Sequence, residues 1–124
     1  MAQNKTIRVG PVALSATLTT NILNPAITSL AGPVGFTMTQ LYLILRHIRI
    51  VNKTSGAVTF SLWLGATGGN AAGTEVIGTA LSVPANSAFD WYGLLRLDAA
   101  DFLVGGASAA TSLTFEAEGE IGIA

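Results

Sequence analysis

The sequence contains no cysteine and few charged residues, and both shortages limit what the protein can be. Without cysteine the chain has neither disulfide bonds nor thiolate metal sites. Charged residues make up 10% of the 124 positions, against about 25% in ordinary soluble domains. A chain of this length is expected to form a single domain, residues 1–124, with enough interior for a hydrophobic core.

Long apolar runs are also missing. A membrane-spanning helix needs about 20 consecutive apolar residues, whereas the best run here, Leu41–Leu45, ends at Arg46. The N-terminal sequence MAQNKTIRVG lacks the apolar stretch of a secretory signal peptide. The sequence therefore predicts a protein without a membrane partner.

With so little charge, other residues must cover the surface of the protein. Hydrophobic residues make up 50% of the sequence, and the mean hydropathy is +0.56. Interfaces in permanent assemblies are more apolar and poorer in charge than free surface, so we expect part of the surface to be buried against copies of the same chain. The six lysines and arginines are scattered and the formal net charge is -1, which argues against nucleic acid as a partner.

The pattern of apolar residues is that of short β-strands. About seven to nine segments alternate or form short apolar runs between turn residues, and no segment shows a long helical period. This combination predicts an all-β fold, an antiparallel β-sandwich or jelly-roll-like domain. The expected strands are Thr6–Val9, Val12–Leu18, Tyr42–Asn52, Val58–Leu64, Glu75–Val83, Ala88–Tyr92, Leu94–Leu97, Phe102–Val104 and Leu113–Glu120.

Four stretches are expected to lie outside the main strands. Residues 1–10 are a candidate N-terminal arm, ended by a Gly-Pro pair that breaks extended structure. Residues 21–40 contain two prolines and predict a long loop, with a short edge strand at Phe36–Thr39 as an option. Gly65–Thr74 is predicted to be a surface loop and Gly105–Ala110 a small-residue linker.

The centre of the chain predicts a β-hairpin as the spine of the sandwich. Tyr42–Asn52 and Val58–Leu64 are the strongest strand signals, and the polar turn Asn52–Gly56 joins them. Alternation in the second of these strands places four large apolar residues on one face, which we expect to form core. These residues are Val58, Phe60, Leu62 and Leu64.

The charged residues of the strands form a candidate interface. Arg46, His47 and Arg49 interrupt an otherwise apolar strand, so both of its faces are expected to be mixed. Three glutamates share one face of the last strand, where they must meet water or basic groups, and we expect this strand to pair beside the basic one. The candidate interface residues are Arg46, His47, Arg49, Trp63, Asp90, Trp91, Arg96, Asp98, Asp101, Glu116, Glu118 and Glu120.

No constellation of residues predicts an active site. His47 is the only histidine, and no nucleophile motif such as GxSxG accompanies it. The glutamates of the last strand are spaced about 7 Å apart, which is wide for one calcium ion. The sequence therefore predicts a protein that is not an enzyme and holds no cofactor or metal.

The aromatic residues leave a binding alternative open. Aromatics at strand positions usually belong to a core or to a subunit interface, but an exposed row of them can also bind sugar rings. The residues concerned are Trp63, Phe89, Trp91 and Tyr92.

Five segments carry a resemblance to a known group of proteins. They are Arg46–Asn52 (RHIRIVN), Ala57–Gly65 (AVTFSLWLG), Asn70–Glu75 (NAAGTE), Val83–Ser87 (VPANS) and Arg96–Leu103 (RLDAADFL). Over roughly the last two-thirds of the chain they resemble small structural proteins encoded in tailed-phage and prophage genomes. The resemblance implies a β-sandwich virion component that oligomerises, above all a capsid decoration (cement) protein, and otherwise a neck or tail part.

The same resemblance implies partners and a location. The partners would be copies of the chain itself, with a trimer as one option, and another virion protein such as the major capsid protein. The protein would be made in the cytoplasm of a bacterial host and reside in the virion. A small self-assembling coat protein and a carbohydrate-binding or receptor-binding virion module stay open as alternatives. The resemblance transfers no individual functional residue.

Overall fold

The structure is a computed structural model that describes residues 4–24 and 41–123. Within these residues the regular structure is entirely β, and no helix has the length and apolarity needed to cross a bilayer. The predicted loop 21–40 is wrong at its start, because Asn21–Leu23 is a strand that pairs with a neighbouring strand. The rest of it from residue 25 on, with Phe36–Thr39, lies outside the described residues. The strands are β1 (Asn4–Ala13), β2 (Asn21–Leu23), β3 (Leu41–Asn52), β4 (Val58–Gly65), β5 (Leu81–Val83), β6 (Ser87–Asp98), β7 (Phe102–Ala107) and β8 (Leu113–Ile123).

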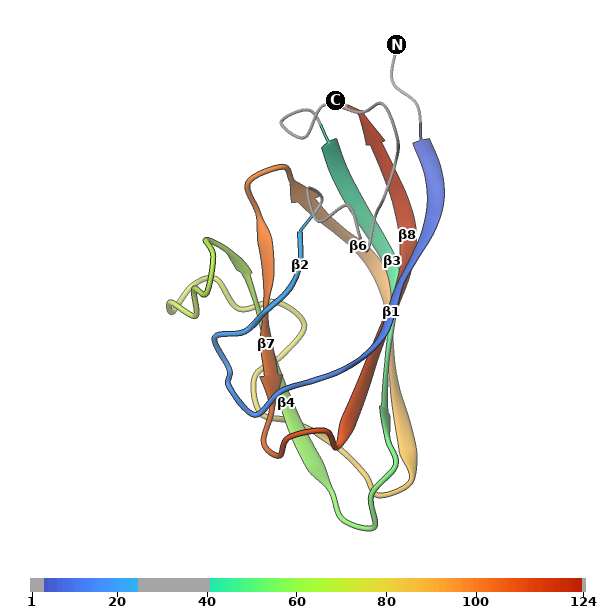
Figure 1. The fold of residues 1–124 in the computed structure, drawn as a ribbon, viewed down its shortest axis with the longest axis vertical. Coiled ribbons are helices and arrows are strands. Elements are labelled where there is room, and N and C mark those ends of the chain that lie inside the picture. Colours follow the sequence, from blue (N-terminus) through green and yellow to red (C-terminus); the bar gives the residue numbers. More distant parts are fainter. Residues whose placement is uncertain (1–3, 25–40, 124) are drawn as a thin grey trace.

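These eight strands form two antiparallel four-stranded sheets that face each other (Figure 1). One sheet has the order β1-β8-β3-β6 and the other the order β2-β7-β4-β5. The pairs β1–β8, β2–β7, β3–β6 and β4–β5 are those of one long antiparallel ribbon, closed between β4 and β5 and rolled up on itself. Eight strands wound in this way make a jelly roll, so the predicted all-β, jelly-roll-like fold is confirmed.

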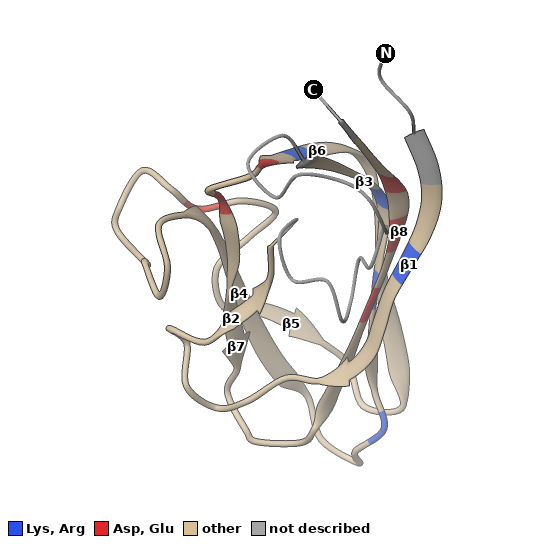
Figure 2. Cartoon of the chain, turned by 45° about the horizontal axis from the view of Figure 1, so that its top comes forward, with Lys and Arg blue, Asp and Glu red and all other residues tan. Residues whose placement is uncertain are grey.

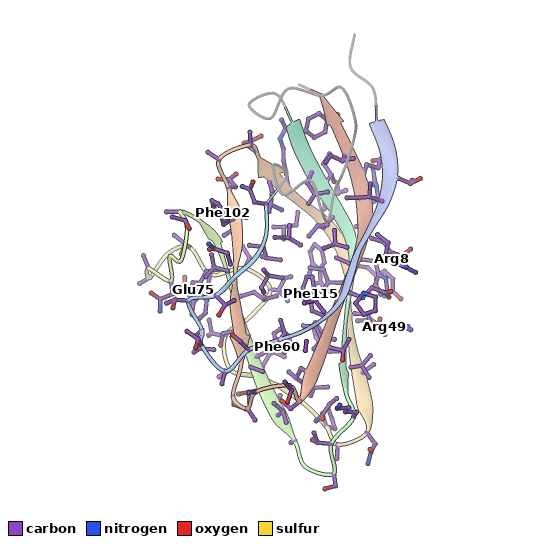
Figure 3. The ribbon with its side chains drawn as sticks, in the orientation of Figure 1. Arg8, Arg49, Phe60, Glu75, Phe102 and Phe115 are labelled. Atoms are coloured by element: carbon purple, nitrogen blue, oxygen red, sulfur yellow. The ribbon has the colours of Figure 1, made fainter. Side chains whose placement is uncertain are left out.

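The hydrophobic core lies between the two sheets. Phe60 on β4 and Phe115 on β8 lie in this space (Figure 3) and are 1% and 0% exposed. Burying such a side chain contributes about 1.5–3 kcal/mol. The predicted core face of β4 is confirmed, because Val58 and Leu62 are buried with Phe60 and Leu64 packs against the core.

The strands β3 and β4 do not form the predicted hairpin. Both edges of β3 are occupied, by β8 and β6, and β4 lies in the other sheet between β7 and β5. The turn after β3 is therefore a crossover between sheets. The fully buried Asn52 holds it, since its Nδ2 donates to the carbonyl oxygens of Gly56 and Val83 at 2.9 Å each and its Oδ1 accepts from the Thr54 N–H at 2.9 Å.

The N-terminal segment is part of a sheet. Of residues 1–10, those from Asn4 onward belong to β1, which pairs with β8. The register shifts between Val9 and Val12, so the Gly10-Pro11 pair forms a bulge inside β1 and does not end the strand as predicted.

The predicted strand Val12–Leu18 is wrong beyond Ala13. The hydroxyl of Ser15 accepts a hydrogen bond from the Thr17 N–H at 3.3 Å and bonds to the hydroxyl of Thr20 at 2.7 Å. These short-range bonds fold the chain into a turn, and side-chain bonds of this kind compete with the extended conformation.

Two predicted strands, Ala88–Tyr92 and Leu94–Leu97, are one continuous strand, β6. The predicted strand Glu75–Val83 is regular only at its end, as β5, because Ile77 and Ala80 take positive φ angles of 67° and 50°.

The predicted linker Gly105–Ala110 begins as the buried end of β7, and only its second part leaves the sheet. Small residues are required there, because a Cβ on Gly105 would overlap the carbonyl oxygen of Ser61. Gly65–Thr74 lies at the surface, with its residues exposed or partly exposed, as predicted.

Candidate assembly surface

The described charged side chains of the β1-β8-β3-β6 sheet lie on its outer side, away from the core. Figure 2 shows basic and acidic segments across all four strands, and Figure 3 shows Arg8 and Arg49 pointing outward. On β8 the alternation is as predicted, with glutamates between the buried positions. We call this surface the charged face, and its side chains are Arg8, Arg46, His47, Arg49, Asp90, Arg96, Asp98, Glu116, Glu118 and Glu120.

A bulge at Arg46 orients the charges on β3. The buried residues of this part of the strand are Leu43, Leu45, Ile48 and Ile50. The buried positions thus change from odd to even numbers across Arg46. On β8, Gly119 lies opposite Leu45 and Glu118 opposite His47, which leaves Arg46 as the extra residue. The expectation that both faces of this strand are mixed is therefore wrong for the inner face, which is apolar. It holds for the outer face, where Val51, 38% exposed, accompanies the charged residues.

Basic residues of β3 meet acidic residues of β8. His47 lies opposite Glu118 in the ladder, with its Nδ1 3.6 Å from Oε1 of the glutamate. Nη2 of Arg46 lies 2.6 Å from Oε2 of Glu120. The predicted pairing of the acidic last strand beside the basic strand is confirmed.

Asp90 on β6 joins the two basic residues on the other side of β3. Its Oδ1 accepts from Nε of Arg49 at 2.8 Å and lies 2.7 Å from Nε2 of His47. The Arg49 guanidinium and the His47 ring hold the pKa of Asp90 below its ordinary value, and the carboxylate raises the pKa of Arg49. The ring of Tyr92 stacks on His47, with centroids 4.6 Å apart and planes 12° from parallel.

A second group of charges lies near the end of β6. Nε of Arg96 donates to Oδ1 of Asp98 at 2.8 Å, and its guanidinium stands 4.5 Å from the centroid of the Tyr42 ring. Asp101, in the turn that follows, accepts from the Asp98 N–H through its Oδ2 at 2.9 Å. The predicted turn from Asp98 to Asp101 is present.

Much of the charged face stays open to solvent. The side chains of Arg8 and Glu118 are 65% and 58% exposed, and Arg8 approaches Glu116 no closer than 3.9 Å. Exposed ion pairs add little to stability, so we expect each of these pairs to contribute only weakly to the stability of the fold. A hollow of about 400 Å³ opens beside His47 and Tyr92, large enough to receive a partner's side chain.

Two kinds of chemistry come into question on the charged face, the ligation of a metal and the activation of a nucleophile by its histidine. Among the described residues no three side chains converge as metal ligands. In the same part of the chain, His47 hydrogen-bonds to a carboxylate and to no hydroxyl or thiol. The surface thus offers charges of both signs, an exposed aromatic ring and a hollow.

Two of the predicted interface residues turn inward. Trp63 on β4 is 7% exposed and lies in the other sheet, and Trp91 on β6 packs against the core. Because Phe89 also packs inward, the predicted alternative of a four-membered aromatic platform is wrong, and only Tyr92 stands on the outer side.

Sequence reasoning missed Leu94, which is 68% exposed beside Tyr92 at 72%. The signal was available, since Asp90, Tyr92, Leu94 and Arg96 are four successive even positions of one strand and share a face.

Comparison with known proteins identifies a fold and no family. No family model matches the chain, and no curated protein matches it. Among solved structures, a chain of infectious bursal disease virus (Gx strain) is 10% identical with a TM-score of 0.51, covering 99% of this chain and 33% of that one. The present chain thus spans about a third of that viral chain.

Two plant virus structures match over most of their own length. The coat protein of Tobacco streak virus, solved as a dimer, is 16% identical with a TM-score of 0.50, covering 98% of this chain and 84% of that one. A chain of Desmodium yellow mottle tymovirus is 10% identical with a TM-score of 0.50, covering 99% and 86%. The jelly roll described above is thus a fold that this chain shares with viral proteins.

Proposed function

We propose that this chain is a non-enzymatic structural protein of a virion, which acts by assembling into or onto the protein shell. The observation that carries the proposal is the jelly-roll fold, shared over 98% of the chain with a viral coat protein. The composition supports it independently, because a surface poor in charge is typical of assembled subunits.

Two forms of this role differ in what the subunit binds. As a shell subunit it would bind mainly its own copies, and the coverage favours this form, since the domain corresponds to 84% of the Tobacco streak virus coat protein chain. As a decoration protein of a tailed phage it would bind a preformed shell of major capsid protein. The near-neutral charge favours this second form, because a protein bound outside a shell has no contact with the packaged nucleic acid.

The non-enzymatic part of the proposal is supported by the charged face. Its only histidine is held between carboxylates and stacked on a tyrosine, an arrangement without a nucleophile for His47 to activate among the described residues.

Light scattering and negative-stain microscopy of the purified chain test the proposal over a range of concentration and ionic strength. Closed particles support the shell subunit. Discrete small oligomers that do not grow into particles support the decoration form, which is then checked by binding to emptied phage shells. A chain that remains monomeric at high micromolar concentration and binds no shell overturns the proposal.

A further inference from the structure

Of the four sheet edges formed by the described strands, that of β6 is the longest. Edge strands expose unpaired N–H and C=O groups, and proteins usually shorten or interrupt them. β2 and β5 have three residues each, and β1 is interrupted by its bulge. β6 runs for 12 residues, from Ser87 to Asp98, and no described strand pairs with its outer edge. Its register against β3 shifts between Tyr92 and Leu95, but its inward residues keep odd numbers on both sides of the shift, since Phe89, Trp91, Leu95 and Leu97 all pack against or lie in the core.

Two large apolar side chains stand exposed at the centre of this strand. Tyr92 is 72% and Leu94 is 68% exposed, and they flank Gly93. The inner side of the strand is filled, because the Trp91 ring lies over Gly93, so close that a Cβ there would come within 2.8 Å of it. Exposed apolar groups beside an unpaired strand edge mark a site of association.

We propose that the outer edge of β6 pairs antiparallel with β6 of a second copy of this chain, about a two-fold axis at Gly93. The segment Asp90–Arg96, DWYGLLR, is complementary to itself when read in the opposite direction. Asp90 lies opposite Arg96 of the second copy, and Tyr92 lies opposite Leu94 of the second copy. Opposite-charge and aromatic–aliphatic pairs are favourable across an antiparallel ladder, and the two-fold axis makes each of them twice.

Neighbouring registers lose this match. A shift by one residue would set the exposed side of one strand against the buried side of the other. A shift by two residues sets Asp90 opposite either Asp98 or Leu94 of the second copy, which removes its pairing with Arg96. The register centred on Gly93 is therefore the one that satisfies both the charges and the apolar residues.

The β6 contact is argued from the strand itself, and it rests on the proposed function only for its biological role, which is assembly. The resulting dimer would join two four-stranded sheets into one continuous sheet. Its outer side would carry the charged faces of both copies.

Cysteine cross-linking tests the register, because the chain has no cysteine of its own. When Tyr92→Cys and Leu94→Cys proteins are mixed, the two thiols lie directly opposite, with Cβ atoms about 4.5–5.5 Å apart, near disulfide geometry. Either protein alone places its thiols on a diagonal about 7–8 Å apart. In a glutathione buffer we expect linked dimers to form about tenfold faster in the mixture than in either protein alone.

The control is Val12→Cys, which lies on β1 at the other edge of the same sheet and is 39% exposed. If either single protein links as fast as the mixture, the proposed register is overturned. If Val12→Cys links to Leu94→Cys and the mixture does not link, the copies associate head to tail and the two-fold contact is overturned.

Light scattering tests the contact in the unaltered chain. We expect the mass to rise with concentration toward twice the chain mass of 12.7 kDa before larger species form. Arg96→Glu sets like charges opposite each other twice and should raise the dissociation constant about tenfold. The matched control is Arg8→Glu, on β1 with its side chain 65% exposed, and it should leave the constant within about twofold.

The outcomes separate this contact from the proposed function. If the chain assembles and Arg96→Glu does not weaken the assembly more than Arg8→Glu does, the β6 contact is overturned and the assembly function stands. A wild-type chain that stays monomeric at every concentration overturns the contact, and the failure of that chain to bind any shell overturns the function as well.

Discussion

The buried side chain of Asn52 connects the two sheets at the crossover between β3 and β4, and replacing it tests the fold directly. Its Nδ2 donates to the carbonyl oxygens of Gly56 and Val83, and its Oδ1 accepts from the N–H and the hydroxyl of Thr54, at 2.7–2.9 Å. Asn52→Asp keeps the size and shape of the side chain and removes both donors. A carboxylate then faces two carbonyl oxygens inside the protein.

The expected loss of stability in Asn52→Asp follows from the two carbonyl groups that lose their hydrogen-bond donor. The carbonyl oxygen of Val83 lies in the buried part of this network, and leaving such a group unsatisfied costs about 1–3 kcal/mol. The carbonyl oxygen of Gly56 keeps a hydrogen bond from the Thr54 hydroxyl at 2.9 Å, so its loss is smaller, about 0.5–1.5 kcal/mol. We expect the free energy of unfolding to fall by about 2–4 kcal/mol.

Urea unfolding followed by tryptophan fluorescence measures this loss. At a typical m value of about 1–3 kcal/mol/M, the midpoint should fall by about 0.7–4 M. The matched control is Asn70→Asp, the same chemical change at an exposed loop position, which should shift the free energy by less than about 0.5 kcal/mol. If both variants unfold at the same midpoint with unchanged m, Asn52 does not hold the crossover and the reasoning fails.

Three further predictions use the same unfolding assay. Gly119→Ala should lower the free energy of unfolding by about 1–3 kcal/mol or more, because a Cβ there would overlap a main-chain oxygen of β3. The control Gly56→Ala, with nothing within 4 Å of the added Cβ, should change it by less than about 1 kcal/mol. Similar losses in the two variants would contradict the close approach of β8 to β3 at Gly119. Asp90→Asn should destabilise the protein at pH 7 and not in acid. The pKa of Asp90 is lowered by Arg49 and the neighbouring histidine, so its contribution is present above the unfolded pKa of about 3.9 and is lost as the pH falls through the folded value; a difference that does not change with pH would refute this. Phe60→Ala should cost about 3–5 kcal/mol, and a loss below about 1 kcal/mol would show that the ring is not in the core.

Strand type and strand faces could be predicted from the sequence wherever the alternation is uninterrupted. On the last strand, Phe115 and Ala117 alternate with Glu116 and Glu118, and the two classes separate onto the buried and outer faces as expected. Period two depends only on the residues of the strand itself. The charges also allowed one strand pairing to be predicted, because the row of glutamates on the last strand favoured a basic strand as its neighbour.

The assignment of residues to the two faces of β3 could not be predicted across the bulge at Arg46. Alternation continued through the strand assigns Ile48 and Leu45 to opposite faces, yet both are fully buried. One extra residue on β3 relative to β8 reverses the phase. The phase shift between the two pairs of buried residues was visible in the sequence. A regular strand that is covered on both sides would show the same pattern of apolar and charged residues, so the pattern alone could not distinguish it from a bulge.

Sheet membership could not be predicted from neighbouring strands. Two strong strand signals joined by a short polar turn favour a hairpin, and β3 and β4 satisfy that description without pairing. What separates them is the occupation of both edges of β3 by strands distant in sequence. The side chain of Asn52 also separates them, because it bonds to Val83 in the other sheet. This contact joins residues distant in sequence, so no local pattern contains it.

The charge balance of the outer face limits the partners that can recognise it. Four arginines stand among five carboxylates, namely Arg8, Arg46, Arg49, Arg96, Asp90, Asp98, Glu116, Glu118 and Glu120. Opposite charges side by side cancel at a distance, and solvent ions screen what is left beyond about 8 Å. We therefore expect such a surface to attract a strongly charged partner such as nucleic acid only weakly. Its charges act at contact, where a wrong register brings like charges together. The face is therefore suited to fixing the register against another protein surface of mixed charge, and a second copy of this chain carries one.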